Sequence, residues 1–210
     1  MSENEDLPPG GTEVDQEAPW HPWYPREVAE RLREIDVPWC VTAGWAIDLH
    51  VGVTTRVHED TEIAVPIRRF PEIRRALSEF DFEVVGSGHI WPLEDQVAFD
   101  VMHQTWVRDR TTGIYHLDIF RDPHEGDEWI CRRDETIRRP YTEVITTTQD
   151  GIPYMVPEIV LLFKAKHDGA KDNADFAAVL PSLAQLQRRW LRDALQRVHP
   201  GHHWLIELGR

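Results

Sequence analysis

The sequence predicts an α+β protein, in which a mixed twisted sheet with flanking helices is followed by a C-terminal helical bundle. Three observations lead to this fold class. Up to about residue 150, short apolar runs typical of strands alternate with segments of helical apolar spacing. Gly151-Ile152-Pro153 then interrupts the pattern, and after Pro157 only helical spacing continues. The chain has 210 residues, enough to bury a core without disulfide bridges.

The first 25 residues differ in composition from the rest. They carry six acidic residues and no lysine or arginine, and several prolines and glycines interrupt them. Such a segment buries too little apolar surface to offset the entropy of ordering, so we expect an acidic, largely disordered tail over residues 1–25. Trp20, Trp23 and Tyr24 at its end are costly to expose, and we expect them to hold the tail on the folded part.

The elements follow in order from the spacing of apolar residues. A helix is expected from Pro25, because Val28, Leu32 and Ile35 recur at helical spacing. The same patterns predict helices over 45–52, 71–80, 172–180 and 183–198 and after Pro157, and strands over 39–42, 61–67, 82–85, 96–103, 114–120, 129–132 and 144–148. We therefore expect one mixed domain over residues 26–150 and a helical domain over residues 151–210.

Composition excludes several classes of function. The formal net charge of −14 argues against general binding to nucleic acid or anionic membranes, since both require a basic surface. No apolar run approaches the length of a membrane span, and the acidic start is unlike a signal peptide. Cys40 and Cys131 are too few for a disulfide framework or a four-thiolate zinc site. We expect a cytoplasmic protein with reduced thiols.

Two carboxylates in the predicted strand 61–67 suggest a metal site. Asp60 and Glu62 are two residues apart, so in extended chain their side chains point to the same side. Adjacent carboxylates repel each other unless a cation lies between them, and hard oxygen ligands favour Mg²⁺ or Mn²⁺. Gly44 precedes a helix, where backbone N–H groups attract phosphate. Together these features are typical of phosphoryl or nucleotidyl transfer.

The same residues resemble a known superfamily. The run Gly44-Trp45-Ala46-Ile47-Asp48, followed by Thr55-Arg56, His58 and Asp60-x-Glu62, resembles the nucleotidyltransferases, most of all aminoglycoside 2″-adenylyltransferases and lincosamide nucleotidyltransferases. Later blocks are similar to bacterial relatives of that group: Gly151-Ile152-Pro153-Tyr154, Pro157-Glu158, 161–166 and 171–176. The resemblance runs from Val37 to the C-terminus and implies a nucleotidyltransferase-like sheet.

The resemblance also implies a set of site residues. Mg²⁺ would be held by Asp60, Glu62 and a third carboxylate on a later strand, which would serve as metal ligand or general base. Asp118 is the favoured match and Asp100 the alternative. ATP or another nucleoside triphosphate would contact Gly44, Trp45, Arg56, His58 and Lys164.

Some of these residues also have plainer interpretations. Arg56 and His58 can simply pair with Glu59 or Asp60, and Trp45 can be a core residue. Asp48 suits the open side of a helix, and Lys171 with Asp175 suits a helix-surface pair. The histidines near the C-terminus invite a metal interpretation, but Pro200-Gly201 favours a flexible break after a helix: His199, His202 and His203.

The sequence departs from the superfamily pattern at two positions. Ala43-Gly44 stands where these proteins have Gly-Gly or Gly-Ser, and Glu62 stands where they have aspartate. The leading hypothesis is a Mg²⁺-dependent enzyme that moves a nucleoside monophosphate, AMP from ATP in the first instance, to a hydroxyl of a small molecule such as an aminoglycoside-like antibiotic. The alternatives are an antitoxin-type enzyme that adenylylates a protein, and a catalytically degenerate fold that acts as a binding module. The sequence does not indicate an oligomeric state.

Overall fold

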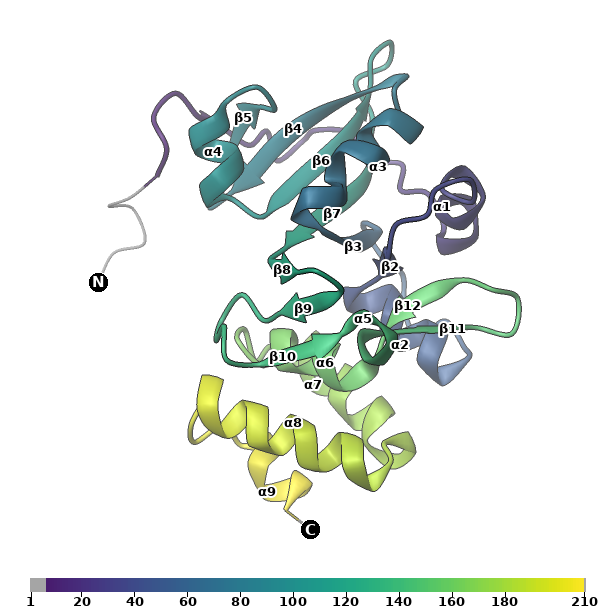
Figure 1. Cartoon of the computed structure of the whole chain (residues 1–210), viewed down its shortest axis with the longest axis vertical. Helices are drawn as coiled ribbons and strands as arrows, with labels where there is room; N and C mark the ends of the chain where they lie inside the picture. The colour runs from purple at the N-terminus through teal and green to yellow at the C-terminus, as the bar shows by residue number, and fades with distance from the viewer. Residues whose placement is uncertain (1–6, 210) are drawn as a thin grey trace. The chain divides into compact units, whose positions relative to one another are not determined.

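The computed structural model describes residues 7–209 and divides into two compact units (Figure 1). Unit 1 comprises the chain up to Val37 together with Glu59–Asp122. Unit 2 comprises Pro38–His58 and the chain from Pro123 onward. Each unit is therefore built from two separate stretches of sequence. The division at residue 150 that composition suggests stays a prediction.

Unit 1 contains a mixed sheet, as the sequence predicts. Its strands lie in the order β1-β5-β4-β6-β7-β3, in which β3 and β7 are parallel and the other pairs are antiparallel (Figure 1). The strands are β1 Thr12–Glu13, β3 Glu62–Pro66, β4 Phe80–Gly86, β5 His89–Pro92, β6 Gln104–Asp109 and β7 Tyr115–Asp122. The sequence patterns did not reveal β1, β5 or β6.

The core of unit 1 lies against one face of β3 and β7. Ile63, Val65, Leu117 and Ile119 alternate with the residues of the other face and are at most 1% exposed. The helical segments of this unit are α1 Pro25–Arg31, the 3₁₀ helix η1 Ile67–Arg69, α3 Phe70–Ala76 and α4 Gln96–Val101. Phe70 of α3 packs against the rings of Phe82 on β4 and Phe99 on α4. Helices α3 and α4 therefore cover the buried face of the sheet.

One predicted strand of unit 1 is a helix. Residues 96–103 were expected to be extended, but 96–101 form α4. Asp95 caps its N-terminus by accepting a hydrogen bond from the N–H of Ala98 at 3.0 Å. At its other end the buried Arg121 donates to the carbonyl of Phe99 at 2.6 Å. These contacts at both ends favour a helix, which places Asp100 outside the sheet.

Aromatic residues attach the segment before α1 to unit 1. The ring of Trp20 stacks on Tyr115 at 5.3 Å, and Trp23, which is 4% exposed, stacks on His116 at 5.1 Å. Tyr24 is instead 67% exposed, so two of the three expected anchors pack. Order extends closer to the N-terminus than the composition predicts, because the carbonyl of Pro8 accepts a hydrogen bond from the indole N–H of Trp91. Residues 1–6 of the predicted tail lie outside the described part of the chain.

Unit 2 contains two sets of paired strands and most of the helices. In one set β12 pairs with β2 and β11, and the other set is a three-stranded sheet of order β10-β9-β8. The strands are β2 Cys40–Val41, β8 His124–Glu125, β9 Glu128–Ile130, β10 Arg138–Pro140, β11 Ile145–Thr147 and β12 Pro153–Met155. The helical segments are α2 Ala43–Val51, α5 Tyr141–Val144, α6 Pro157–Lys164, α7 Ala170–Val179, the 3₁₀ helix η2 Leu180–Ser182, α8 Gln185–Val198 and α9 Trp204–Leu208.

The predicted C-terminal bundle is formed by α6 to α9, with α2 packed on α6 and α7 (Figure 1). A buried carboxylate ties its parts together. Glu158 of α6 is 2% exposed and accepts hydrogen bonds at 2.9 Å from both Arg139 and Gln187. Such a carboxylate is held in the core only because both of its oxygens have donors. Within residues 7–209, none of the helices has the length and apolar character needed to span a bilayer.

Candidate functional site

The parallel pairing of β3 and β7 brings two of the predicted metal ligands together in unit 1. Glu62 is the register partner of Asp118, so the two residues lie side by side on neighbouring strands with their side chains on the same face. The N–H of Asp118 donates to the carbonyl of Thr61 at 2.9 Å, which fixes this register. Ile63, Val65, Leu117 and Ile119, which are at most 1% exposed, point to the opposite face.

Asp118 is the most buried of the three predicted carboxylates, at 3% exposed. Its Oδ2 accepts a hydrogen bond at 2.8 Å from the side-chain amide of Gln104, a residue of β6. A carboxylate in so apolar a setting keeps its charge only if it is hydrogen bonded or close to a cation. Gln104 therefore orients Asp118. Nothing in the sequence pointed to Gln104, because β6 was not recognised.

Glu62 and Asp118 offer carboxylate oxygens, the donor type that fits a hard divalent cation. Asp60 precedes Glu62 by two residues and is half-buried. The role of the acidic trio in metal binding stays a prediction.

The alternative third carboxylate, Asp100, has a different environment. It lies on α4 and is exposed, and its Oδ1 accepts a hydrogen bond at 2.7 Å from Gln96, four residues earlier on the same helix. Asp118 instead lies on the strand next to Glu62. The expectation that Asp100 sits on a sheet strand was wrong, because the 96–103 segment is capped as a helix.

The turn that begins α2 in unit 2 has an unusual backbone. Ala43 adopts φ = 50°, in the left-handed region that a residue with a Cβ disfavours. Glycine would adopt this backbone conformation with less strain. At Gly44 the constraint is space, since an added Cβ would collide with the guanidinium of Arg56 and lie 2.7 Å from Nδ1 of His58. Gly44 thus allows two predicted nucleotide-binding side chains to approach the start of α2.

His58 is held in a buried network beside Gly44. Its Nε2 lies 2.6 Å from Oδ2 of Asp48, and the other oxygen of Asp48 accepts a 2.5 Å hydrogen bond from the hydroxyl of Thr55. The ring of Trp45 stacks on the imidazole at 4.3 Å. Asp48 is 4% exposed, so the expectation that it faces the open side of its helix was wrong. A carboxylate with two donors is stable in the core.

The two predicted cationic contacts share a buried carboxylate of α7. Nζ of Lys164 lies 2.8 Å and Nη2 of Arg56 3.8 Å from Oδ2 of Asp175, which is 3% exposed. Lys164 also lies 3.4 Å from Asp172. Asp175 was expected to form a helix-surface pair with Lys171. It faces the core instead, because the apolar side of α7 that carries Phe176 and Val179 turns it inward.

The structure thus gathers the predicted residues into two groups, one in each unit. Unit 1 holds the acidic residues Asp60, Glu62 and Asp118. Unit 2 holds the predicted nucleotide-binding residues, which are linked through Asp48 and Asp175: Gly44, Trp45, Arg56, His58 and Lys164. Sequence reasoning missed both linking carboxylates, although acidic residues at apolar positions of a helical pattern were a usable signal.

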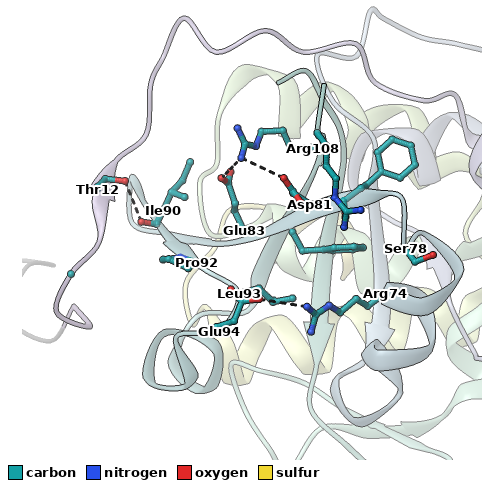
Figure 2. Close-up of a pocket in the computed structure, with 14 residues that line it drawn as sticks. Thr12, Arg74, Ser78, Asp81, Glu83, Ile90, Pro92, Leu93, Glu94 and Arg108 are labelled. Carbon is teal, nitrogen blue, oxygen red and sulfur yellow. Dashed lines mark hydrogen bonds and ion pairs between the residues drawn. The ribbon is translucent and has the colours of Figure 1, made fainter. Parts of the chain in front are cut away.

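Unit 1 also contains a pocket of about 610 Å³, which none of the predicted site residues lines. Its wall is rich in ion pairs: Arg108 lies 3.2 Å from Glu83 and 3.8 Å from Asp81, and Arg74 lies 3.5 Å from Glu94 (Figure 2). Since these guanidinium groups are matched by nearby carboxylates, the pocket offers no excess of either charge to a ligand.

Comparisons with known proteins agree with the resemblance seen in the motifs. The family model described as aminoglycoside-2″-adenylyltransferase matches residues 26–105. A comparison with curated proteins gave no match.

Solved structures of two such enzymes have a similar fold. The structure of the lincosamide antibiotic adenylyltransferase LnuA with lincomycin bound superimposes with a TM-score of 0.52 at 17% identity, over 80% of this chain and 98% of that one. ANT(2″)-Ia in complex with adenylyl-2″-tobramycin gives a TM-score of 0.55 at 14% identity, over 82% of this chain and 94% of that one. The chain therefore has a nucleotidyltransferase-like fold and resembles the aminoglycoside-2″-adenylyltransferase family.

Proposed function

We propose that the protein is a nucleotidyltransferase that transfers AMP from ATP to a hydroxyl of a small antibiotic-like molecule. The observation that carries the proposal is the placement of Glu62 and Asp118 as register partners on one face of β3 and β7. Two adjacent carboxylates on a buried strand pair serve no packing purpose, because burying like charges together is unfavourable. A cation bound between them, together with a phosphate group, would offset this repulsion.

Asp60, Glu62 and Asp118 are the residues that would hold Mg²⁺. When bound, the ion supplies neutralisation of the triphosphate charge. All three ligands are carboxylates, which is the donor type that Mg²⁺ prefers. The acidic group belongs to unit 1, whose mixed sheet is similar in fold to adenylyltransferases.

We assign the proton transfer to Asp118. Its carboxylate accepts the proton of the acceptor hydroxyl as the hydroxyl oxygen bonds to the α-phosphorus. The bond from the α-phosphorus to the bridging oxygen breaks, and pyrophosphate leaves with the electron pair. Gln104 positions the carboxylate through its 2.8 Å hydrogen bond to Oδ2.

In unit 2, Gly44, Trp45, Arg56, His58 and Lys164 are the proposed nucleotide-binding residues. Arg56 and Lys164 carry the positive charge that a triphosphate requires, and they are already held in one cluster by Asp175. The anion and Asp175 would compete for the same two cations, so binding would loosen the 3.8 Å contact of Arg56 before the 2.8 Å contact of Lys164.

A direct assay tests the proposal. The protein is incubated with MgCl₂, ATP labelled at the α-phosphate and a panel of aminoglycosides and lincosamides, and the label is followed into the acceptor. We expect labelled product and an equivalent of pyrophosphate, both dependent on MgCl₂. ATP binding without the acceptor is measured in parallel by calorimetry. Binding without label transfer to any acceptor of the panel would contradict the proposed acceptor class.

One observation favours a second candidate, a nucleotide-binding module without catalysis. Ala43 keeps a strained φ of 50° and adds a methyl group at the turn where these relatives have glycine. In this case Mg²⁺-dependent ATP binding would survive, and neither label transfer nor pyrophosphate release would be detected with any acceptor, protein acceptors included.

A further inference from the structure

A separate cluster in unit 2 has the composition of a transition-metal site. It consists of Asp168, in the connection between α6 and α7, and two histidines just before α9, His202 and His203. The ligand atoms of these residues all lie within 4.8 Å of one another, and no other group of three in residues 7–209 satisfies this condition. None of the three belongs to the proposed nucleotidyl-transfer residues.

The distances fit a tetrahedral ion. Four ligands that each lie about 2.0–2.1 Å from zinc are about 3.3 Å apart. Oδ1 of Asp168 lies 2.9 Å from Nε2 of His203 and 3.8 Å from Nε2 of His202, values that bracket this spacing. The third distance, between the ligand nitrogens of the two histidines, is at most 4.8 Å, so rotation of the exposed His203 side chain is the movement that would bring all three atoms onto one ion.

His202 provides the second, independent observation. Its side chain is only 7% exposed, yet no described residue meets its Nε2 with the distance and angle of a hydrogen bond, and this nitrogen faces Oδ1 of Asp168 at 3.8 Å. A buried ring nitrogen without a partner costs about 1–3 kcal/mol in a folded protein. Coordination to a metal would satisfy this atom.

Neighbouring residues hold the carboxylate of Asp168 in place and leave one side of the proposed metal position open to solvent. Asn173 of α7 donates to Oδ1 of Asp168 at 3.0 Å, and its own side-chain oxygen accepts from the indole of Trp204 at 2.7 Å. Asn173 therefore links the metal-ligating carboxylate to α9. His203 and Asp168 are 52% and 43% exposed, so water can reach the fourth position. Three protein ligands with an open position are typical of non-structural zinc sites.

We propose that Asp168, His202 and His203 bind Zn²⁺ through Oδ1, Nε2 and Nε2. Two imidazoles and a carboxylate are ligands that suit zinc and disfavour Mg²⁺. Binding has one cost within the cluster, because Nδ1 of His202 accepts a 3.2 Å hydrogen bond from the N–H of Trp204. Coordination at Nε2 moves the ring proton to Nδ1 and gives up this contact, so we expect affinity in the micromolar rather than the nanomolar range.

The test uses the full-length protein without an affinity tag, because tag histidines bind metal. Co²⁺ is titrated in place of Zn²⁺ and followed by its visible absorption, which is intense for tetrahedral and weak for octahedral coordination. We expect one equivalent with tetrahedral absorption, displaced by Zn²⁺ and unaffected by excess Mg²⁺. The Asp60→Asn variant should give the same titration, which separates this site from the acidic residues of unit 1.

Single substitutions identify the ligands. His202→Gln, His203→Gln and Asp168→Asn should each weaken Co²⁺ binding at least ~100-fold, because loss of an outer-shell partner alone costs 10–100-fold. His167→Gln is the matched control, as this exposed histidine precedes Asp168 directly and lies outside the ligand group. Zn²⁺ should raise the Tm of the parent and of His167→Gln and not that of His203→Gln. Equal loss in His167→Gln, or octahedral Co²⁺ spectra in the parent, would overturn the proposal.

Discussion

Oδ2 of Asp48 lies 2.6 Å from Nε2 of His58, and both side chains are 3% exposed. The contact links the middle of α2 to the segment that follows this helix, and it determines which ring nitrogen faces Gly44. With Nε2 engaged by Asp48, Nδ1 is turned toward the start of α2. Asp48 therefore acts as a positioning residue for His58.

Replacement of Asp48 by asparagine should expose this dependence. The variant keeps the shape of the side chain and removes the charge, so the buried ring nitrogen loses a charge-assisted partner. We expect a loss of about 1–3 kcal/mol in the free energy of unfolding, measured by urea titration. Asp193→Asn, at a side chain 61% exposed, is the control and should change stability by less than about 0.5 kcal/mol. An unchanged urea midpoint for Asp48→Asn would show that the contact between Asp48 and His58 does not contribute to stability.

The assignment of Asp118 as general base predicts that substitutions of Asp118 and Asp100 affect turnover differently. Asp118→Asn should reduce turnover by ~10²–10⁴-fold while ATP binding is retained, because Asp60 and Glu62 remain to hold the cation. Asp100→Asn should leave turnover unchanged, because Asp100 is exposed on α4 and bonded only locally to Gln96. Turnover and calorimetric ATP affinity are measured on the same preparations. The reverse pattern would transfer the role of base to Asp100.

Lys164 and Lys166 allow a matched test of nucleotide binding. They are two residues apart, so one faces Asp175 in the cluster while the other is exposed. We expect Lys164→Gln to weaken ATP binding by about tenfold or more, since hydrogen bonds to charged groups contribute about 1.5–3 kcal/mol. Lys166→Gln should bind ATP like the parent. Equal affinities in all three proteins would restrict Lys164 to a structural role beside Asp175.

The strained turn at α2 predicts a stabilising substitution. Ala43→Gly relieves a left-handed conformation that costs an L-residue about 1–2 kcal/mol, offset in part by the greater freedom of glycine in the unfolded chain. The net gain should be about 0.5–1 kcal/mol by urea unfolding. Ala46→Gly, three residues later in the same helix and fully buried, should instead lose about 1 kcal/mol or more. A loss in both variants would mean that the φ of Ala43 is not a source of strain.

Stability should also fall on acidification through His50. Burial lowers the pKa of this histidine from its usual 6.5, with an opposing contribution from Glu158 that raises it. His50 therefore takes up a proton at higher pH in the unfolded chain than in the folded one. The stability that the uncharged His50 contributes at neutral pH is lost as the pH drops below about 6.5. The His50→Gln variant should show a flatter dependence of unfolding free energy on pH between 7 and 5. Parallel curves for the two proteins would contradict this.

Long or strongly patterned elements could be predicted from the sequence, and short ones could not. The helices at Pro25 and after Pro157 and the strands ending in Pro66 and Asp122 follow apolar spacing that the core requires. By contrast, β1, β5 and β6 are recognisable only through their partners, because pairing across the sheet decides whether such segments are extended. Residues 96–101 illustrate the same limit, since the cap at Asp95 starts a helix in a segment predicted to be a strand.

The candidate residues divide in the same way. Glu62 and Asp118 could be singled out because an acidic residue among strand apolar residues stands out locally. The partners of Arg56, His58 and Lys164 could not be chosen, since Asp175 lies far from Arg56 in sequence and meets it only through the packing of α2 on α7. The metal interpretation of His202 and His203 was set aside from the sequence because their carboxylate partner, Asp168, belongs to another helix connection.

The interleaving of the two units along the chain has a consequence for synthesis. Pro38–His58 leaves the ribosome before any other part of unit 2, and the whole of Glu59–Asp122 follows before the rest of that unit begins. Helix α2, with its strained turn and its buried aspartate, must therefore wait for α6 and α7 before Asp48 and Ala46 are shielded from water. Unit 1 can mature first around this unfinished loop, which makes 38–58 the stretch most exposed to proteases and chaperones in the nascent protein.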